Sequence, residues 1–190
     1  LLPTGTAGLE VQDGFVTDAH FQITNLGFQK TDGIDIAYTH RFPEGPLGLF
    51  TLTADVTHIL NFDRQASPNS PVEELAGDFL YPDWVGTARL RWRKDAWRAS
   101  VAGFYTSGYR DDPTNRTLDA LGLPRDGEYF VDDYITFDLA VSYDIARDSF
   151  VQLAVRNVLD EDPPLVLGSS SNVDLFNHDL IGRYATVSFV

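Results

Sequence analysis

The stretch Ile135-Thr-Phe-Asp-Leu-Ala-Val-Ser-Tyr143 alternates strictly between large apolar side chains and small or polar ones. Successive side chains of a β-strand point to opposite faces, so this alternation predicts a strand with one apolar and one polar face. The stretch has nine residues. Strands of soluble sheets usually have about 5–6 residues, whereas a tilted strand needs about 9–11 to cross a bilayer. Its length therefore favours a strand that spans a membrane.

The same alternation recurs along most of the chain, and helical periodicity is nearly absent. The other predicted strands are residues 20–26, 34–42, 50–60, 84–93, 97–106, 151–156 and 184–189. Together with 135–143 they make about eight strands, several of them long. The sequence therefore predicts an all-β fold built on one antiparallel sheet.

Short and long connections alternate between these strands. The short ones are 42–47, 94–96 and 144–148, and the long ones are 61–83, 108–133 and 158–180. Outer-membrane β-barrels have short periplasmic turns and long outer loops, which is the same pattern. On this scheme 27–32 is a short outer loop and the chain ends on the periplasmic side. Residues 1–19 are either a loop or a weak strand near 9–16.

Composition excludes several classes of protein. The chain has 190 residues, a formal net charge of −14, no Cys and no Met. Without Cys there is no disulfide framework and no thiolate metal site, and strong acidity argues against a nucleic-acid partner. No apolar run approaches the roughly 18 residues of a membrane helix. The missing Met leads us to expect a processed chain or part of a longer one.

A soluble β-sandwich that binds carbohydrate would also have strands with one apolar face. Three features favour a membrane barrel instead. Aromatic residues such as Trp84, Trp97 and Tyr143 stand at strand ends, as in the girdles at membrane interfaces. The polar face carries mid-strand charges of both signs, which suits a wet interior. The apolar face includes small residues such as Gly86 and Gly103, which would fill a soluble core poorly.

The polar face of a barrel lines its interior. We therefore expect the following residues to face the lumen: Asp35, Arg41, Asp55, Arg89, Arg91, Arg93, Arg98, Asp138, Gln152 and Arg156. The arginines have two interpretations. They guide an anionic ligand or engage a segment held inside the barrel, or they pair with aspartates of the lumen and with residues of that segment, and the number of positions favours pairing. Aromatic residues of the long connections are candidates for ligand contact at the mouth or for interface anchoring: Phe79, Tyr81, Tyr109, Tyr129 and Phe130.

No pattern in the chain predicts catalysis or a cofactor. The four histidines fall on separate elements and have no metal-ligand spacing. Acidic clusters at 111–112, 132–133 and 160–162 lack the calcium-loop pattern, so solvated charge is the favoured interpretation. Because the acidic excess sits largely in the long connections, we also expect divalent cations, Ca²⁺ among them, to bridge these loops to anionic lipopolysaccharide.

Four blocks, in order and on the expected strands, resemble the C-terminal portion of TonB-dependent outer-membrane receptors. The first is Asn25 to Ile36, the second is Tyr81-Pro-Asp-Trp84, the third is Asn157-Val-Leu-Asp160 followed by two prolines, and the fourth is Gly182-Arg183 leading to Phe189. The residues that carry the resemblance are Asn25, Gly33, Asp35, Pro82, Trp84, Asn157, Asp160, Pro163, Gly182, Arg183 and Phe189. Val190 departs from the aromatic terminus usual in the family.

The resemblance implies that residues 20–190 are the last strands of a 22-stranded barrel whose lumen holds an N-terminal plug with a TonB box. It implies a Gram-negative outer membrane and TonB-driven uptake of a large scarce nutrient such as a ferric siderophore, cobalamin, haem or an oligosaccharide. The implied partners are outer-membrane lipid and lipopolysaccharide, the plug and remaining strands, TonB acting through the plug, and the nutrient. A complete eight-stranded barrel of structural or adhesin type is the alternative within the membrane.

Overall fold

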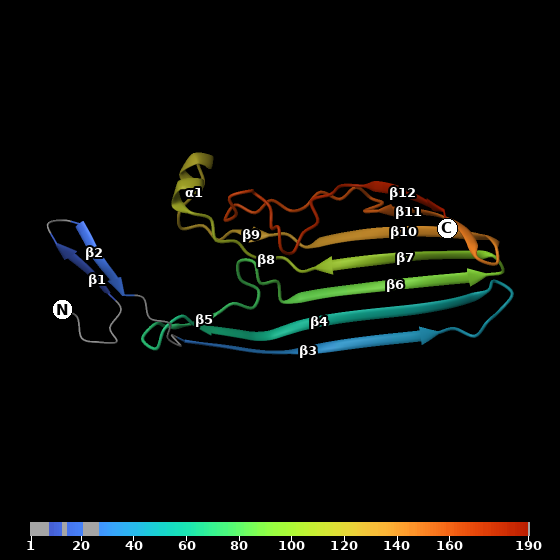
Figure 1. The fold of residues 1–190 in the computed structure, drawn as a ribbon, viewed down its shortest axis with the longest axis horizontal. Helices are drawn as coiled ribbons and strands as arrows, with labels where there is room; N and C mark the ends of the chain where they lie inside the picture. Colours follow the sequence, from blue (N-terminus) through green and yellow to red (C-terminus); the bar gives the residue numbers. More distant parts are fainter. Residues whose placement is uncertain (1–7, 13–14, 21–26, 190) are drawn as a thin grey trace.

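The computed structural model describes residues 8–12, 15–20 and 27–189, and it is dominated by one antiparallel sheet (Figure 1). Its main strands are β3 (Phe28–Arg41), β4 (Leu49–Gln65), β6 (Trp84–Lys94), β7 (Trp97–Thr106), β10 (Tyr134–Ala146), β11 (Ser149–Arg156) and β12 (Tyr184–Phe189). They lie side by side in the order β12-β11-β10-β7-β6-β4-β3, and the short β5 (Val72–Glu74) pairs with β4. The predicted all-β, antiparallel fold is confirmed.

β3 and β12 are the two edges of this sheet and do not pair with each other within the described residues. The described strands therefore form an open sheet and not the closed small barrel of the alternative interpretation. Residues 8–20 contain a separate hairpin of β1 (Gly8–Gln12) and β2 (Phe15–His20). Most of the strand expected at 20–26 lies outside the described residues.

The strand boundaries differ from the prediction chiefly where β3 pairs with β4. β4 runs to Gln65, so residues 61–65 belong to a strand and not to the long connection expected at 61–83. Residues 27–32 are not an outer loop, because β3 begins at Phe28 and pairs with β4 from Phe28↔Gln65 onward. Residues 28–32 do not alternate between apolar and polar side chains, but their backbone pairs with β4 like the rest of β3. A bulge between Asp32 and Gly33 shifts the register there. A Cβ on Gly33 would lie 2.6 Å from the carbonyl oxygen of His58, so the close approach of β4 needs glycine.

One face of the sheet is apolar and open. Its exposed residues include Ile36 (57%), Trp97 (48%) and Trp84 (39%), and none of the three tryptophans is buried. A soluble sandwich would cover this face with a second sheet, and the described residues contain none. An apolar surface this extensive is the mark of a lipid or protein contact.

The long connections 66–83, 107–133 and 157–183 all leave one end of the sheet, and the short turns leave the other (Figure 1). The long connections contain β5, the two-residue strands β8 (Tyr109–Arg110) and β9 (Phe130–Val131), and the helix α1 (Asn115–Leu121). Thr114 caps the start of α1 by accepting from the Thr117 amide, and Gly122 ends it in the left-handed region. No helix among the described residues has the length and apolar character needed to span a membrane.

Candidate functional site

The three long connections pack against one another, and we call them together the loop cluster. Its small core consists of Tyr109, Val131 and Val166, with Phe79 packed against them. Val166 has no exposed surface, and Tyr109 is 3% exposed. Since all three connections contribute residues to this core, they form one folded unit and not three independent loops.

Asp111 joins the second and third connections. Its carboxylate accepts hydrogen bonds from the backbone N–H groups of Leu167 (2.6 Å), Gly168 (2.9 Å) and Asp112 (2.9 Å), and the residue is 6% exposed. The interpretation of residues 111–112 as solvated charge is therefore wrong for Asp111, although Asp112 is exposed. Sequence alone did not indicate this role because two adjacent aspartates look alike until the partner backbone is placed.

A second junction lies at Asp174, which is 1% exposed. Its carboxylate accepts from the Tyr109 hydroxyl (2.7 Å) and from the side-chain and backbone N–H groups of Asn177. Asn177 also donates to the carbonyl of Leu80. The segment therefore joins all three connections. Burial alone would raise the pKa of Asp174, but these hydrogen bonds hold it below the ordinary value. Burial raises the pKa of Tyr109 strongly.

His178 completes this junction and was not singled out by sequence reasoning. It is 6% exposed, and its ring lies against Tyr134, with centroids 5.0 Å apart, and against Tyr109 at 6.4 Å. Neither ring nitrogen has a hydrogen-bond partner among the described residues. Burial lowers the pKa of His178, while the nearby Asp174 carboxylate opposes the shift.

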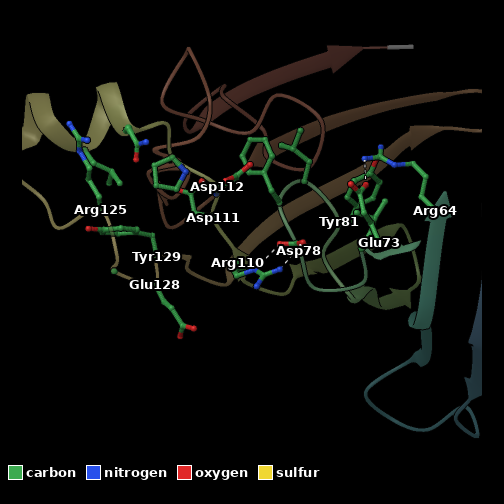
Figure 2. A pocket seen from close by; sticks show the side chains of 17 residues that line it. Arg64, Glu73, Asp78, Tyr81, Arg110, Asp111, Asp112, Arg125, Glu128 and Tyr129 are labelled. Carbon is green, nitrogen blue, oxygen red and sulfur yellow. Dashed lines mark hydrogen bonds and ion pairs between the residues drawn. The ribbon is translucent and has the colours of Figure 1, made fainter. Parts of the chain in front are cut away.

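Beside this core the loop cluster forms a pocket of about 830 Å³. Figure 2 shows two of its arginines held by carboxylates. Arg110 makes a bidentate pair with Asp78, both contacts being 2.9 Å, and Arg64 contacts Glu73 at 2.9 Å. The hydrogen bond from Arg110 holds the pKa of Asp78 below its usual value despite partial burial. These pairs present fixed donors and acceptors to the pocket.

The predicted ligand-contact residues divide between three places. Phe79, Tyr81 and Tyr129 line the pocket together. Tyr109 does not, because its ring forms the core of the loop cluster. Phe130 is 65% exposed and borders a neighbouring hollow with Asp132 and Asp133. Contact with a ligand stays a prediction for all five aromatic residues.

All ten residues expected in the lumen lie on one face of the sheet, which we call the polar face. The strand register establishes this, since Arg41, Arg91 and Arg98 stand opposite Thr51, Ser100 and Ser142 respectively. The other expected residues follow the same parity: Asp35, Asp55, Arg89, Arg93, Asp138, Gln152 and Arg156. That this face lines a lumen stays a prediction.

Charge pairing explains only part of the arginine set. Arg98 pairs with Asp144, and Arg156 lies 3.4 Å from Asp138. Within the described residues the remaining arginines of the polar face make no ion pair: Arg41, Arg89, Arg91 and Arg93. The described residues supply no carboxylate partner for these four, and pairing of the lumen arginines with aspartates or plug residues outside the described part of the chain stays a prediction.

The structure brings two of the sequence blocks together. Asn157 has φ 47° and closes a turn in which its side chain bonds the backbone of Glu161 in both directions. Asp160 then accepts from the Arg183 amide (2.8 Å) and pairs with its guanidinium (3.3 Å). A Cβ on Gly182 would lie 3.3 Å from the Asp160 carboxylate. The blocks meet because one starts and the other ends the same connection.

The other blocks have separate positions. Trp84 stacks on His58 with ring centroids 3.8 Å apart, and its amide donates to Ser107. Pro82, just before it, is buried. Asp35 accepts from the Thr57 hydroxyl at 2.6 Å. The remaining family-motif residues have no polar side-chain contact or lie outside the described residues: Asn25 is outside them, Pro163 is half-buried and Phe189 is exposed.

A family model for the TonB-dependent receptor-like β-barrel matches residues 4–158. The chain belongs to this family. The family implies an outer-membrane receptor with a plug and TonB as its general partners, and it is a family of transporters and not of enzymes. The match ends at 158, so the blocks around Asp160, Gly182 and Phe189 lie beyond it. Comparison with curated proteins gave no match, and comparison with solved structures gave none.

No group of three or more His, Cys, Asp or Glu side chains in the described part of the receptor has the arrangement of a metal site. What this barrel segment offers chemically is a folded set of loops over the sheet. Its pocket combines aromatic rings with paired charges, and nothing in it resembles a nucleophile with an adjacent base.

Proposed function

We propose that this chain supplies wall strands and outer loops to a TonB-driven receptor of a Gram-negative bacterium, as part of a 22-stranded barrel. In this proposal the receptor takes up a large, scarce nutrient of the class of ferric siderophores, cobalamin, haem or oligosaccharides. The plug, with its TonB box, occupies the interior against the polar face. The apolar face contacts lipid, and the loop cluster faces the outside.

The observation that carries this proposal is the pocket in the loop cluster. A ligand site is a concavity that combines apolar surface with a few fixed polar groups, commonly about 300–1,000 Å³. The pocket has about 830 Å³, the rings of Tyr81 and Tyr129, and the locked Arg110–Asp78 pair. In addition, the buried junctions at Asp111 and Asp174 hold its walls in place, which reduces the ordering cost of binding.

The experiment uses the complete receptor in cells with and without TonB, and a panel of ferric siderophore, cobalamin, haem and oligosaccharide. We expect uptake of a panel member that depends on TonB, and a loss of its binding in Tyr81→Ala and Tyr129→Ala variants. Leu121→Ala is the matched control, because Leu121 is 56% exposed and does not line the pocket. Uptake that is equal without TonB, or binding that the pocket variants leave unchanged, would overturn the proposal.

We also propose that divalent cations bridge the loop cluster to lipopolysaccharide. Each long connection carries a net charge of −4, so the three together hold −12 of the net −14. Anionic lipid phosphates would repel this surface unless cations lay between them, and carboxylate oxygens are ligands that Ca²⁺ accepts.

A further inference from the structure

The polar face has a hollow of about 370 Å³ near the short-turn end of the sheet. We call it the basic hollow, and the polar side chains that line it and matter here are Arg91, Arg93, Arg98, Ser100, Ser142 and Gln152. It lies on strands β4, β6, β7, β10 and β11, whereas the pocket of the loop cluster lies at the opposite end. Its place in a barrel interior rests on the proposed function, which sets the plug against the polar face but assigns no role to this hollow.

Strand register brings these side chains into two neighbouring rows. In one row Arg93 stands directly opposite Arg98, Arg98 opposite Ser142, and Ser142 opposite Gln152. In the next row Arg91 stands opposite Ser100. Side chains directly opposite each other on one face are about 4.5–5.5 Å apart at Cβ. Arg91 and Arg93 therefore line one space with Ser100 and Ser142, while the Arg98 guanidinium pairs with Asp144 and lies over the Phe150 ring, 5.3 Å from its centroid.

The positive charge of the basic hollow is not balanced by the described residues. Asp144 pairs with Arg98, but neither Arg91 nor Arg93 has a carboxylate within ion-pair distance in the described part of the chain. The Arg93↔Arg98 pair places like charges directly across two strands, which is destabilising on its own. Three of the twelve arginines of a chain with a net charge of −14 line this one hollow.

We propose that the basic hollow is a binding site for an oxyanion, a carboxylate or a phosphate. Arginine presents donors in a planar fork that fits both groups in a bidentate way, and it has no acceptor to offer a cation. Ser100 and Ser142 add hydroxyl donors on the same side. An anion bound by Arg91 and Arg93 neutralises the two arginines that lack a carboxylate partner among the described residues, and it offsets the repulsion between Arg93 and Arg98.

The oxyanion has two sources that chemistry alone does not separate. It is a free anion in the barrel interior, or it is a carboxylate from the part of the receptor that fills this interior. Both sources make the same prediction for the arginines: removing their charge weakens the site. An empty hollow makes the opposite prediction, because neutralising one of two repelling charges would leave stability unchanged or raise it.

The test is thermal unfolding of the complete receptor in detergent, titrated with inorganic phosphate against chloride of equal ionic strength. The variants are Arg91→Gln/Arg93→Gln, the charge-keeping Arg91→Lys/Arg93→Lys, and the control Arg116→Gln on the exposed side of α1. Arg98 is left intact because it already pairs with Asp144.

A free anion predicts a saturable rise in the unfolding temperature with phosphate, and at least about tenfold weaker binding in the Gln variant. A carboxylate of the receptor predicts no effect of phosphate, a lower unfolding temperature in the Gln variant, and substantial retention in the Lys variant. Either result supports the proposal. An unfolding temperature that the Gln variant leaves unchanged or raises, without a phosphate effect, overturns it. So does an equal loss in the Gln and Lys variants, because the charge would then not matter.

Discussion

Asp111 is a buried side chain that bonds two backbone amides of another long connection, and its removal makes the sharpest test of the loop cluster. The perturbation is Asp111→Ala, with Asp111→Asn as a milder form. Asp112→Ala is the matched control, because Asp112 is the adjacent aspartate, is exposed, and makes no side-chain hydrogen bond among the described residues. Both alanine variants remove one negative charge from adjacent positions, so they differ in the burial of the side chain and in the hydrogen bonds that are lost.

The magnitude follows from the two cross-connections, to Leu167 and Gly168. A hydrogen bond to a charged group contributes about 1.5–3 kcal/mol, and a buried N–H left without a partner costs about 1–3 kcal/mol. Water entering the opened site recovers part of this loss, so we expect a local cost of about 3 kcal/mol for the alanine variant. Asp111→Asn keeps one acceptor oxygen and should cost roughly half as much.

Hydrogen exchange measured by mass spectrometry on the complete receptor is the assay. A cost of about 3 kcal/mol corresponds to roughly a 100-fold loss of protection around residues 165–170. The strand at 135–143 should keep its protection, since its hydrogen bonds lie in the sheet. If Asp111→Ala changes the 165–170 segment no more than Asp112→Ala does, the third connection does not depend on Asp111 and the reasoning fails.

Three further predictions concern the same end of the molecule. Burial lowers the pKa of His178 from its ordinary 6.5, so the folded cluster binds a proton less readily than the opened one, and stability falls as pH drops below about 6.5. We expect hydrogen exchange in the loops, corrected for intrinsic rates, to rise by up to about tenfold per pH unit towards pH 5. His178→Phe should abolish this dependence. The loss of stability from protonation of Asp174 should remain in that variant, below pH 4. Arg110→Gln should lower the free energy of urea unfolding by less than about 1 kcal/mol, because the Arg110 side chain is 57% exposed, and a larger loss would mean that its pair with Asp78 is structural. In vesicles that contain lipopolysaccharide, a chelator should increase exchange in the long connections, and unchanged exchange would count against the cation bridge.

The sheet could be predicted from the sequence because its signal is local. Alternation within each strand fixes which face a side chain takes, and Ile135 to Tyr143 needed no knowledge of its neighbours. The prediction was wrong at 27–32, where the polar residues Lys30 and Asp32 interrupt the alternation but the backbone still pairs with β4. Backbone pairing does not depend on side-chain polarity, so it leaves no mark in the sequence there.

The loop cluster could be predicted only in part, because its contacts join residues far apart in the chain. Tyr81 and Tyr129 were identified as mouth residues from their type and position, and they do line one pocket. The roles of Asp111 and His178 depend on which backbone or ring arrives from another connection. A buried histidine without a partner has no local signal. The nearest local signal is the segment Asp174-Leu-Phe-Asn-His178, in which the side chains of Asp174 and Asn177 bond each other.

Charge is separated along the strands: the end with the long connections is acidic, and the end with the short turns carries arginines. The long connections hold −12 of the net −14, whereas Arg91 and Arg93 lie near the short turns. From Asp83 to Arg93 the chain advances ten residues along β6, which at about 3.3 Å per residue is roughly 30 Å. The Debye length at physiological ionic strength is about 8 Å, so salt largely screens the electrostatic interaction between the two regions. In the proposed receptor the acidic loops govern which ligands approach, in a salt-dependent way, and the proposed oxyanion site holds its ligand through direct contacts. Raising salt should change the rate of ligand association at the mouth well before it changes the effect of an oxyanion on the unfolding temperature.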